Sequence, residues 1–414
     1  MANQKPLVGA AIIGQSGGPS AVINASAYGV IKTALESESI TTVYGAFHGI
    51  VGVLNDRLMI MDKEDPKELE KMLYTPSSAL GSCRYKIADP DADDTDYKRI
   101  LEIFKKYNVR YFFYNGGNDS MDTCNKINRY MQKVGYECRV FGVPKTIDND
   151  LFGTDHCPGF ASAAKYIATS VMEVSRDCQV YDKGMITIIE CMGRHAGWLT
   201  AATALAGAKG DGPDLIYLPE VDFNMEDFLD DVIRVYNGRG SCLVAVSEGI
   251  HYADGAFVSE AKASSTDGFG HAQLGGLAAR LANIVKAATG AKVRGIELSL
   301  LQRCAAHCAS GTDIEESFNS GKLAVEAALR GESGKMVGFR CDRKDGYVCH
   351  YELFNLEDVA NYEKKVPLEW ITSDNAYVTE DFIDYCMPLI AGETGMKKVD
   401  GLPDFVKLKR IFAE

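Results

Sequence analysis

The chain has 414 residues, which is too long for one ordinary core and predicts at least two domains. Hydrophobic residues make up 46% and charged residues 24%, as in soluble globular proteins, so disordered, collagen-like and coiled-coil classes are excluded. A net charge of −13, without any block of lysines and arginines, argues against nucleic-acid or membrane-surface binding. An anionic ligand would therefore need positive charge gathered locally at one site.

The apolar stretch Leu7–Ile13 opens the chain and runs directly into a glycine-rich turn, so we expect a buried strand rather than a signal peptide. No run approaches the ~20 apolar residues that cross a bilayer. Twelve cysteines are scattered without framework spacing, which indicates reduced thiols in a cytoplasmic protein. Cys304, His307 and Cys308 could share one helix face and offer three ligands to a metal, but packing of that face is the favoured interpretation.

A recurring unit of apolar strand, glycine turn and amphipathic helix indicates an α/β protein with mainly parallel sheets. The unit is clearest after three predicted strands, Leu7–Gly14, Val109–Tyr114 and Met185–Glu190. Further strands are predicted at Thr42–Ala46, Val140–Val143, Leu215–Leu218, Cys242–Ser247 and Gly295–Leu300. Helices are predicted around Val22–Ile31, from near Ser120, over His195–Ala206 and over Asp222–Arg239.

Two regions lack this unit. Asp254–Gly275 is rich in Gly, Ser and Ala and is predicted to be an exposed loop, and Asp342–Glu414 is predicted to be an appended segment that wraps the second domain. In parallel sheets, ligands collect outside the carboxyl ends of the strands. The three glycine turns are therefore expected to form the walls of a site.

The first turn, Ser16–Ser20, has two glycines before a helix and suits a phosphate group, although it matches neither a Walker A sequence nor a dinucleotide fingerprint. The second turn adds an amide, a carboxylate and a hydroxyl from Asn118, Asp119 and Ser120, a set suited to hydrated Mg²⁺. Its alternative interpretation is a capped helix start.

The third segment, Pro144–Asp150, follows a predicted strand directly. If it is extended, Asp148 and Asp150 lie on one face in line with Thr146, so that one carboxylate can take a proton from an attacking alcohol. The compact ammonium group of Lys145 suits a phosphate. A solvated acidic turn is the alternative interpretation.

Together these motifs resemble the phosphofructokinase family, and within it the pyrophosphate-dependent branch. The resemblance spans about residues 8–330 and rests on Gly17-Gly18 with Asn24, Gly116–Ser120, Pro144–Asp150, Met192–Gly197, Pro219-Glu220, Ser247-Glu248 and Gln302-Arg303. It implies two similar Rossmann-like three-layer α/β domains with the active site in the cleft between them. The donor domain would comprise residues 1–150 and about 302–340, and the fructose 6-phosphate domain residues 151–301 with an extension over about 341–414.

The resemblance also implies roles for individual residues. Asp148 resembles the general base, with Thr146, Asp150 and Arg194 at the transferring phosphate. Donor-binding positions are Gly17, Gly18, Arg84, Gly117, Asp119, Ser120 and Lys145, with Mg²⁺ at Asp119 and Asn118. Sugar-binding positions are Met192, Gly193, Glu220, Arg303 and Arg294, the last of which matches an arginine that reaches across a subunit interface and implies a homodimer or homotetramer.

Two positions indicate the phosphoryl donor. ATP-dependent relatives usually carry glycine where this chain has Asp119 and Lys145. The carboxylate would crowd and repel the α-phosphate of a nucleotide, while the ammonium can pair with a donor that ends after two phosphates. The resemblance thus implies reversible phosphoryl transfer between pyrophosphate and fructose 6-phosphate, used in glycolysis and gluconeogenesis.

Three positions depart from the family pattern. Asn118 replaces a magnesium-associated aspartate, Met185 an interface arginine and Leu300 a sugar-phosphate histidine, for which Lys183 or a residue of Asp254–Gly275 could compensate. Three alternatives stay open at this point: an ATP-dependent enzyme, an enzyme that accepts sedoheptulose 7-phosphate, and a non-catalytic sugar-phosphate sensor.

Overall fold

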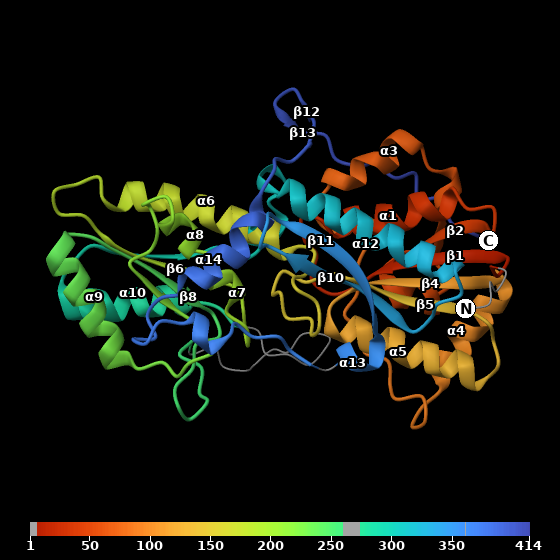
Figure 1. The fold of residues 1–414 in the computed structure, drawn as a ribbon, viewed down its shortest axis with the longest axis horizontal. Helices are drawn as coiled ribbons and strands as arrows, with labels where there is room; N and C mark the ends of the chain where they lie inside the picture. The colour runs from red at the N-terminus through yellow and green to blue at the C-terminus, as the bar shows by residue number, and fades with distance from the viewer. Residues whose placement is uncertain (1–5, 260–273, 361) are drawn as a thin grey trace.

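The computed structural model describes residues 6–259, 274–360 and 362–414. Two β-sheets, each covered by helices on both faces, lie side by side along the long axis of the molecule (Figure 1). The predicted architecture of two three-layer α/β units with mainly parallel sheets is confirmed. Within the described ranges, no helix is both long and apolar enough to span a bilayer.

The first sheet has seven strands in the order β11-β10-β5-β4-β1-β2-β3, of which β3 and β11 run antiparallel to their neighbours. Its strands are β1 Gly9–Gln15, β2 Ile40–Ala46, β3 Leu58–Ile60, β4 Val109–Gly116, β5 Arg139–Pro144, β10 Lys335–Asp342 and β11 Val348–Asn355. Side chains alternate between the faces, so Ile12 packs with Phe112 on one side and Ile13 with Phe113 on the other.

Four long helices cover this sheet. The side chains of α4 (Thr95–Lys106) and α5 (Asn118–Lys133) share the core that contains Ile12. Those of α1 (Ile23–Leu35) and α12 (Gly311–Leu329) share the core that contains Ile13. Helices α4 and α5 bury one apolar stripe, as expected for amphipathic helices on a sheet, whereas α1 is buried on nearly all sides from Ile23 to Ile31.

The second sheet has four parallel strands in the order β7-β8-β6-β9. They are β6 Ile186–Cys191, β7 Leu215–Tyr217, β8 Cys242–Ser247 and β9 Val293–Glu297. One face packs on α6 Phe160–Cys178, α7 Trp198–Ala201, α8 Ala204–Gly207 and α14 Glu380–Cys386, and the other on α9 Met225–Arg239 and α10 Leu277–Thr289. The remaining elements are short: α2 Gly49–Leu54, η1 Met61–Lys63, α3 Pro66–Glu70, η2 Lys71–Tyr74, α11 Leu301–Cys304, η3 Ala306–Cys308, α13 Leu356–Val359, η4 Leu368–Trp370, η5 Met387–Ile390, β12 Lys398–Val399 and β13 Leu402–Pro403.

Helices α1 and α12 touch through two glycines. A Cβ on Gly29 would lie 2.0 Å from the carbonyl oxygen of Phe318, and one on Gly321 would lie 2.0 Å from that of Ser26. Both neighbours are helix backbone, which cannot move aside locally. The two missing side chains therefore set how closely the helices pack.

We expect Gly29→Ala to lower the free energy of unfolding by about 3 kcal/mol or more, because over-packing a rigid contact separates the helices. Gly238→Ala on α9 is the matched control, because nothing lies within 4 Å of the position that a Cβ would take there. That helical substitution should be neutral or stabilising by up to about 1 kcal/mol. Urea denaturation of both variants checks the difference, and equal midpoints would contradict it.

Two sequence predictions need correction, and a third lies largely outside the described residues. The helix expected over His195–Ala206 is two short helices, α7 and α8, because the Thr203 hydroxyl donates to the carbonyl of Thr200 at 2.6 Å and tightens the chain there. The strand expected over Gly295–Leu300 ends earlier, at Glu297. Ser299 has a φ of 42° and starts the turn into α11. Of the loop predicted over Asp254–Gly275, residues 260–273 lie outside the described residues.

The chain after Asp342 does not simply wrap the second domain. Strand β11 pairs with β10 at the edge of the first sheet, and the last residues return to β3, where Ile60 N–H donates to the Ile411 carbonyl at 2.8 Å. Only the intervening part, with α14, packs against the second sheet's helices. The apolar residues Met336, Val337 and Phe339 explain the difference, since they bury β10 in the first core.

Candidate active site

Two of the predicted glycine turns and the segment Pro144–Asp150 meet at one edge of the first sheet, whereas the third glycine turn follows β6 in the second sheet. Gln15 at the end of β1 pairs with Asn115 of β4, and Gly116 of β4 pairs with Pro144 of β5, so the turns that follow are neighbours. They enclose a cavity of about 550 Å³, which we call the donor cavity. Its lining residues are Gly17, Gly18, Arg84, Lys86, Gly117, Asn118, Asp119, Ser120, Lys145, Thr146, Asp148, Asp150, Tyr362 and Glu363.

The first glycine turn holds the segment that carries Arg84. Gly17, in the left-handed region at a φ of 75°, donates its N–H to the Cys83 carbonyl at 3.0 Å. The Ser82 hydroxyl donates back to the Gly17 carbonyl at 2.7 Å. These two bonds fix the backbone on both sides of the turn and place Arg84 over the donor cavity.

The segment after β5 is a turn rather than the extended stretch predicted from the sequence. The chain turns at Ile147 and Asp148, and Asn149 takes a φ of 55°. The buried Asn149 side chain keeps this conformation, because it donates to the Tyr385 hydroxyl at 2.8 Å and accepts from Cys157 N–H at 2.9 Å. Thr146, Asp148 and Asp150 still line the same cavity.

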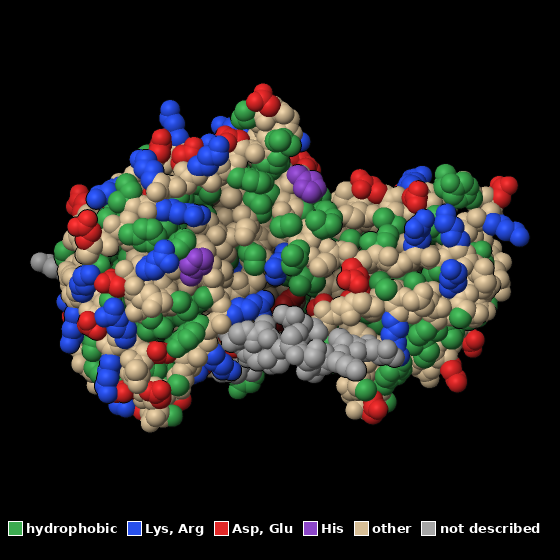
Figure 2. Space-filling view, turned by 180° about the vertical axis from the view of Figure 1, so that it is seen from behind, with side chains coloured by type: hydrophobic (Ala, Val, Ile, Leu, Met, Phe, Trp, Pro, Cys, Tyr) green, Lys and Arg blue, Asp and Glu red, His purple; other side chains and the backbone are tan. Residues whose placement is uncertain are grey.

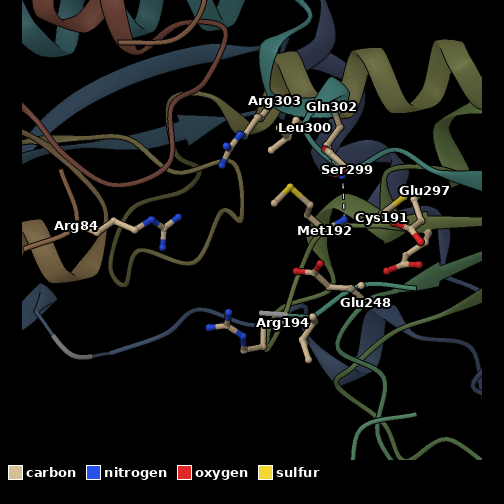
Figure 3. A pocket seen from close by; sticks show the side chains of 13 residues that line it. Arg84, Cys191, Met192, Arg194, Glu248, Glu297, Ser299, Leu300, Gln302 and Arg303 are labelled. Atoms are coloured by element: carbon tan, nitrogen blue, oxygen red, sulfur yellow. Dashed lines mark hydrogen bonds between the residues drawn. The ribbon is translucent and has the colours of Figure 1, made fainter. Parts of the chain in front are cut away.

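A second cavity, of about 600 Å³, lies beyond the donor cavity, and we call it the acceptor cavity. Arg84 lines both cavities. Figure 3 shows Arg84, Arg194 and Arg303 reaching into the acceptor cavity from different elements. The remaining lining residues are Glu190, Cys191, Met192, Glu248, Leu274, Gly275, Glu297, Ser299, Leu300 and Gln302.

The predicted segment around Met192 is held by two side chains that are distant from it in the sequence. Met192 N–H donates to the Gln302 side-chain oxygen at 3.2 Å (Figure 3), and Gly193 N–H donates to Glu248 Oε1 at 3.2 Å. Gly193 has a φ of 137°, and a Cβ there would lie 2.5 Å from the Ala196 carbonyl oxygen. The glycine is therefore needed for the sharp turn that presents Arg194.

Positive charge gathers where the two cavities meet. A Cβ on Gly18 would lie 2.9 Å from Arg303 Nη1 and 3.5 Å from Arg84 Nη2, so this glycine leaves room for two guanidinium groups. Burial, together with the charge of Arg84, lowers the pKa of Arg303. Two neighbouring guanidinium groups repel each other unless an anion lies between them. In a chain of net charge −13, this junction is the local positive patch that an anionic ligand requires.

Two titratable groups of the donor cavity, the Asp148 carboxyl and the Lys145 ammonium, have strongly shifted pKa values. Burial, with the nearby Asp150 and Glu248, raises the pKa of Asp148 to about 7, although Lys145 and Arg194 oppose the shift. Burial and the charge of Arg84 lower the pKa of Lys145 to about 8, against the attraction of Asp148. A half-buried carboxylate that titrates near neutrality is suited to general-base chemistry.

Two oxygen atoms of the donor cavity are suited to a cation. The Asn118 side-chain amide donates to Asp150 Oδ2 at 3.2 Å. Asn118 Oδ1 and Asp150 Oδ1 are both buried and accept no hydrogen bond from any described residue. A buried oxygen without a hydrogen-bond partner lowers the stability of the fold. Amide and carboxylate oxygens are preferred ligands of Mg²⁺.

The acceptor cavity carries both signs of charge. Three arginines face three glutamates, Glu190, Glu248 and Glu297. Burial and the neighbouring carboxylates raise the pKa of Glu190 to about 7. On the surface shown in Figure 2, basic and acidic side chains likewise meet at the hollow between the two lobes. Guanidinium groups bind phosphate and carboxylates accept from hydroxyls, so this lining suits a phosphorylated polyol.

Comparison with known proteins gives the evolutionary relation. The pattern of the phosphofructokinase family matches residues 10–328. The chain belongs to the phosphofructokinase family. Over 97% of its length it is 43% identical to a pyrophosphate--fructose 6-phosphate 1-phosphotransferase of Halomonas elongata, and the match covers 96% of that protein. Over 96% of its length it is 44% identical to the protein of the same name from Methylococcus capsulatus, and the match covers 95% of that protein. A solved pyrophosphate-dependent phosphofructokinase of Marinobacter aquaeolei superposes with a TM-score of 0.89 at 42% identity, covering 98% of each chain.

All but three of the site residues proposed from the phosphofructokinase resemblance line one of the two cavities; the exceptions are Gly193, Glu220 and Arg294. Glu220 accepts from Gly197 N–H at 2.8 Å and from Val366 N–H at 3.0 Å, so it supports the backbone behind the acceptor cavity. Arg294 is exposed on β9 and lines neither cavity of this chain. Met185 and Lys183 precede β6, at the end of the sheet opposite the site, so neither adds to this chain's acceptor cavity.

The expectation that Cys304, His307 and Cys308 share one packed helix face is wrong, because Cys304 and His307 are exposed. Cys304 ends α11, whereas His307 and Cys308 lie in the separate helix η3. In the described part of the chain, the one group of side chains with metal-ligand spacing is instead Asp155, His156 and Cys341. All twelve cysteines are free thiols, as predicted, and most are buried.

Sequence reasoning missed several lining residues. Lys86 lies 3.9 Å from Asp119 in the donor cavity, and Tyr362 and Glu363 come from the distant chain after α13. Glu190 and Glu297 face the acceptor cavity. Each of these two glutamates lies at the end of an apolar strand, and this position is the sequence feature that could have identified it. Nothing in the local sequence could have placed Tyr362 or Glu363.

Proposed function

We propose that this chain transfers a phosphoryl group between pyrophosphate and the 1-hydroxyl of fructose 6-phosphate, forming phosphate and fructose 1,6-bisphosphate reversibly. The observation that carries the proposal is the junction of the two cavities, where Arg84 lines both and Arg303 lies beside it over Gly18. The donor and the sugar would meet there. The full-length similarity to two pyrophosphate--fructose 6-phosphate 1-phosphotransferases supports the same reaction.

Phosphoryl transfer depends on alignment and on neutralising the phosphate oxygens. Asp148 accepts the proton of the attacking hydroxyl. It lines the donor cavity, and the charges of Glu248 and Arg194 in the acceptor cavity influence its pKa, so it lies near both substrates. Lys145 and Arg84 hold pyrophosphate over the first glycine turn. Arg194 and Arg303 neutralise charge on the sugar side.

Within the donor cavity, Asn118 and Asp150 would hold Mg²⁺ through their unpartnered oxygens. This differs from the pair inferred from the sequence, because Asp119 faces Lys86 whereas Asp150 faces Asn118. When bound, the ion would neutralise pyrophosphate oxygens. Asn118 thus keeps a ligand oxygen even though it replaces an aspartate.

Pyrophosphate is favoured over ATP by the two donor residues. Lys145 is buried, and its Nζ lies 3.4 Å from the position that a Cβ on Gly17 would take. Its ammonium therefore lies next to the first glycine turn. Asp119 lies elsewhere in the donor cavity, 3.9 Å from the exposed Lys86. This arrangement supports the binding of a short, highly charged donor.

The reaction is tested by measuring product with each donor and acceptor, with and without magnesium. Fructose 1,6-bisphosphate should form from fructose 6-phosphate with pyrophosphate and Mg²⁺, and not detectably with ATP. Faster turnover with ATP or with sedoheptulose 7-phosphate would replace this assignment by the corresponding alternative, and absence of turnover with every pair would favour a sensor. We also propose that the enzyme is cytoplasmic, serves glycolysis and gluconeogenesis, and forms a homodimer or homotetramer through Arg294.

The pH dependence of kcat/KM should be bell-shaped. Asp148 cannot accept a proton below its pKa of about 7, and Lys145 loses its charge above its pKa of about 8. Activity should thus rise with pH through the first value and fall through the second. Initial rates between pH 5.5 and 9.5 at subsaturating pyrophosphate check this. A profile without an acidic limb would contradict the role of Asp148.

A further inference from the structure

Cys341 and Cys349 lie directly opposite each other on β10 and β11. Directly opposed residues of antiparallel strands have Cα atoms about 4.5–5.5 Å apart, inside the range of about 4.4–6.8 Å that a disulfide requires. Their side chains also leave the sheet on the same face. The backbone is therefore already arranged for a bond between the two sulfur atoms, which are now free thiols.

The two sulfur atoms have unequal surroundings. Cys341 Sγ lies 3.8 Å from His156 Nδ1 and 3.5 Å from the Tyr347 hydroxyl. The fully buried His156 ring lies between two carboxylates, 3.0 Å from Asp155 Oδ1 and 2.6 Å from Glu316 Oε2. Burial opposes a charge on this ring, but these hydrogen bonds raise the pKa of His156 well above its usual value. A cation thus lies beside the Cys341 sulfur.

Cys341 is the more acidic thiol of the pair. The hydrogen bond from Cys349 and the charge of His156 lower the pKa of Cys341 to about 6, although burial opposes the shift. The same hydrogen bond raises the pKa of Cys349. A thiolate next to a protonated thiol is the usual arrangement of an attacking and a resolving cysteine. Both are half-buried near the end of the β10–β11 hairpin, within reach of small oxidants.

The same cluster contacts the catalytic turn. His156 is followed by Cys157, whose N–H donates to the side chain of Asn149 at 2.9 Å. Asn149 lies between Asp148 and Asp150 and keeps its left-handed conformation through that contact. One shared backbone segment therefore connects the partners of His156 to the two carboxylates.

We propose that Cys341 and Cys349 are a reversible redox pair, and that their disulfide slows phosphoryl transfer; the effect on rate rests on the proposed function. The oxidant is a low-molecular-weight disulfide. The Cys341 thiolate attacks one of its sulfur atoms, forming a mixed disulfide and releasing one thiolate. Cys349 then loses its proton and attacks the Cys341 sulfur, which releases the second thiolate. Two protein thiols are oxidised and one small disulfide is reduced to two thiols.

The test treats the reduced full chain with glutathione disulfide, alkylates the remaining thiols and maps the peptides by mass spectrometry. We expect a Cys341–Cys349 cross-link that dithiothreitol removes. Cys349→Ser should stop at a glutathione adduct on Cys341, and Cys341→Ser should react at neither position. The matched control, Cys304→Ser with Cys308→Ser, should still form the cross-link. Absence of the cross-link in the unaltered chain overturns the proposal.

The rate is measured on the same samples. Oxidation should lower kcat about two- to thirtyfold, the usual size of coupling through a packed network, and reduction should restore it. Cys341→Ser should give the same kcat before and after treatment. An unchanged kcat in the fully cross-linked enzyme overturns the coupling to the catalytic turn. Because the peptide map needs no turnover, a failure of the proposed reaction would be recognised separately in the reduced enzyme.

Discussion

Replacing Asp148 by asparagine is expected to lower kcat for pyrophosphate and fructose 6-phosphate by about 10²–10⁴-fold. Loss of a positioned general base raises the barrier by about 3–5 kcal/mol. Asparagine keeps the shape of the side chain, so the turn held by Asn149 should be preserved. Steady-state kinetics with saturating Mg²⁺ measure the effect, and a kcat within threefold of the parent would contradict the assignment.

The fold itself should not suffer from this change. Burial raises the pKa of Asp148 in the folded chain to about 7, above its unfolded value. The folded state therefore binds more protons between these two values, and stability falls as pH rises through them. At pH 8 the ionised carboxylate is a cost that asparagine removes, so the melting temperature of Asp148→Asn should equal or exceed that of the parent. A marked decrease would mean that the kinetic loss reflects misfolding.

The second large effect is expected at Lys145. Lys145→Met keeps most of the side-chain volume but removes the ammonium from the floor of the donor cavity. Loss of a buried charged partner typically costs about 2–5 kcal/mol, so kcat/KM for pyrophosphate should fall about 30- to 5,000-fold. The basic limb of the pH profile should disappear at the same time, because no other group is assigned to it.

Lys86→Met is the matched control for this variant. Lys86 lines the same cavity, but its side chain is 57% exposed and its partner Asp119 is 3.9 Å away. Exposed ion pairs contribute little to binding, so kcat/KM should change less than about fivefold.

The double variant Asp119→Gly with Lys145→Gly should use pyrophosphate poorly as well. Unchanged pyrophosphate kinetics in that variant would remove the argument for donor discrimination.

The catalytic residues show how much of the site can be predicted from the local sequence. Two glycine turns and the Lys145–Asp150 run each follow an apolar strand, and ligands collect at that end of parallel strands. This local pattern was enough to place Gly17, Asp119 and Asp148 at one site. The extended conformation expected for the third segment was wrong, because the left-handed Asn149 is held by Tyr385, more than two hundred residues away.

The amino-acid sequence by itself determined the alternation of strands and helices, the glycine turns and the chemistry of the residues in them, because these depend on side chains close together in the chain. Only the tertiary structure decided that Arg84 lies between two cavities, that Arg303 reaches Gly18 and that β11 completes the first sheet. It also decided that Cys341 faces His156. Each of these contacts joins distant segments, and their approach is set by how the sheets and helices bury apolar surface rather than by local conformational preference.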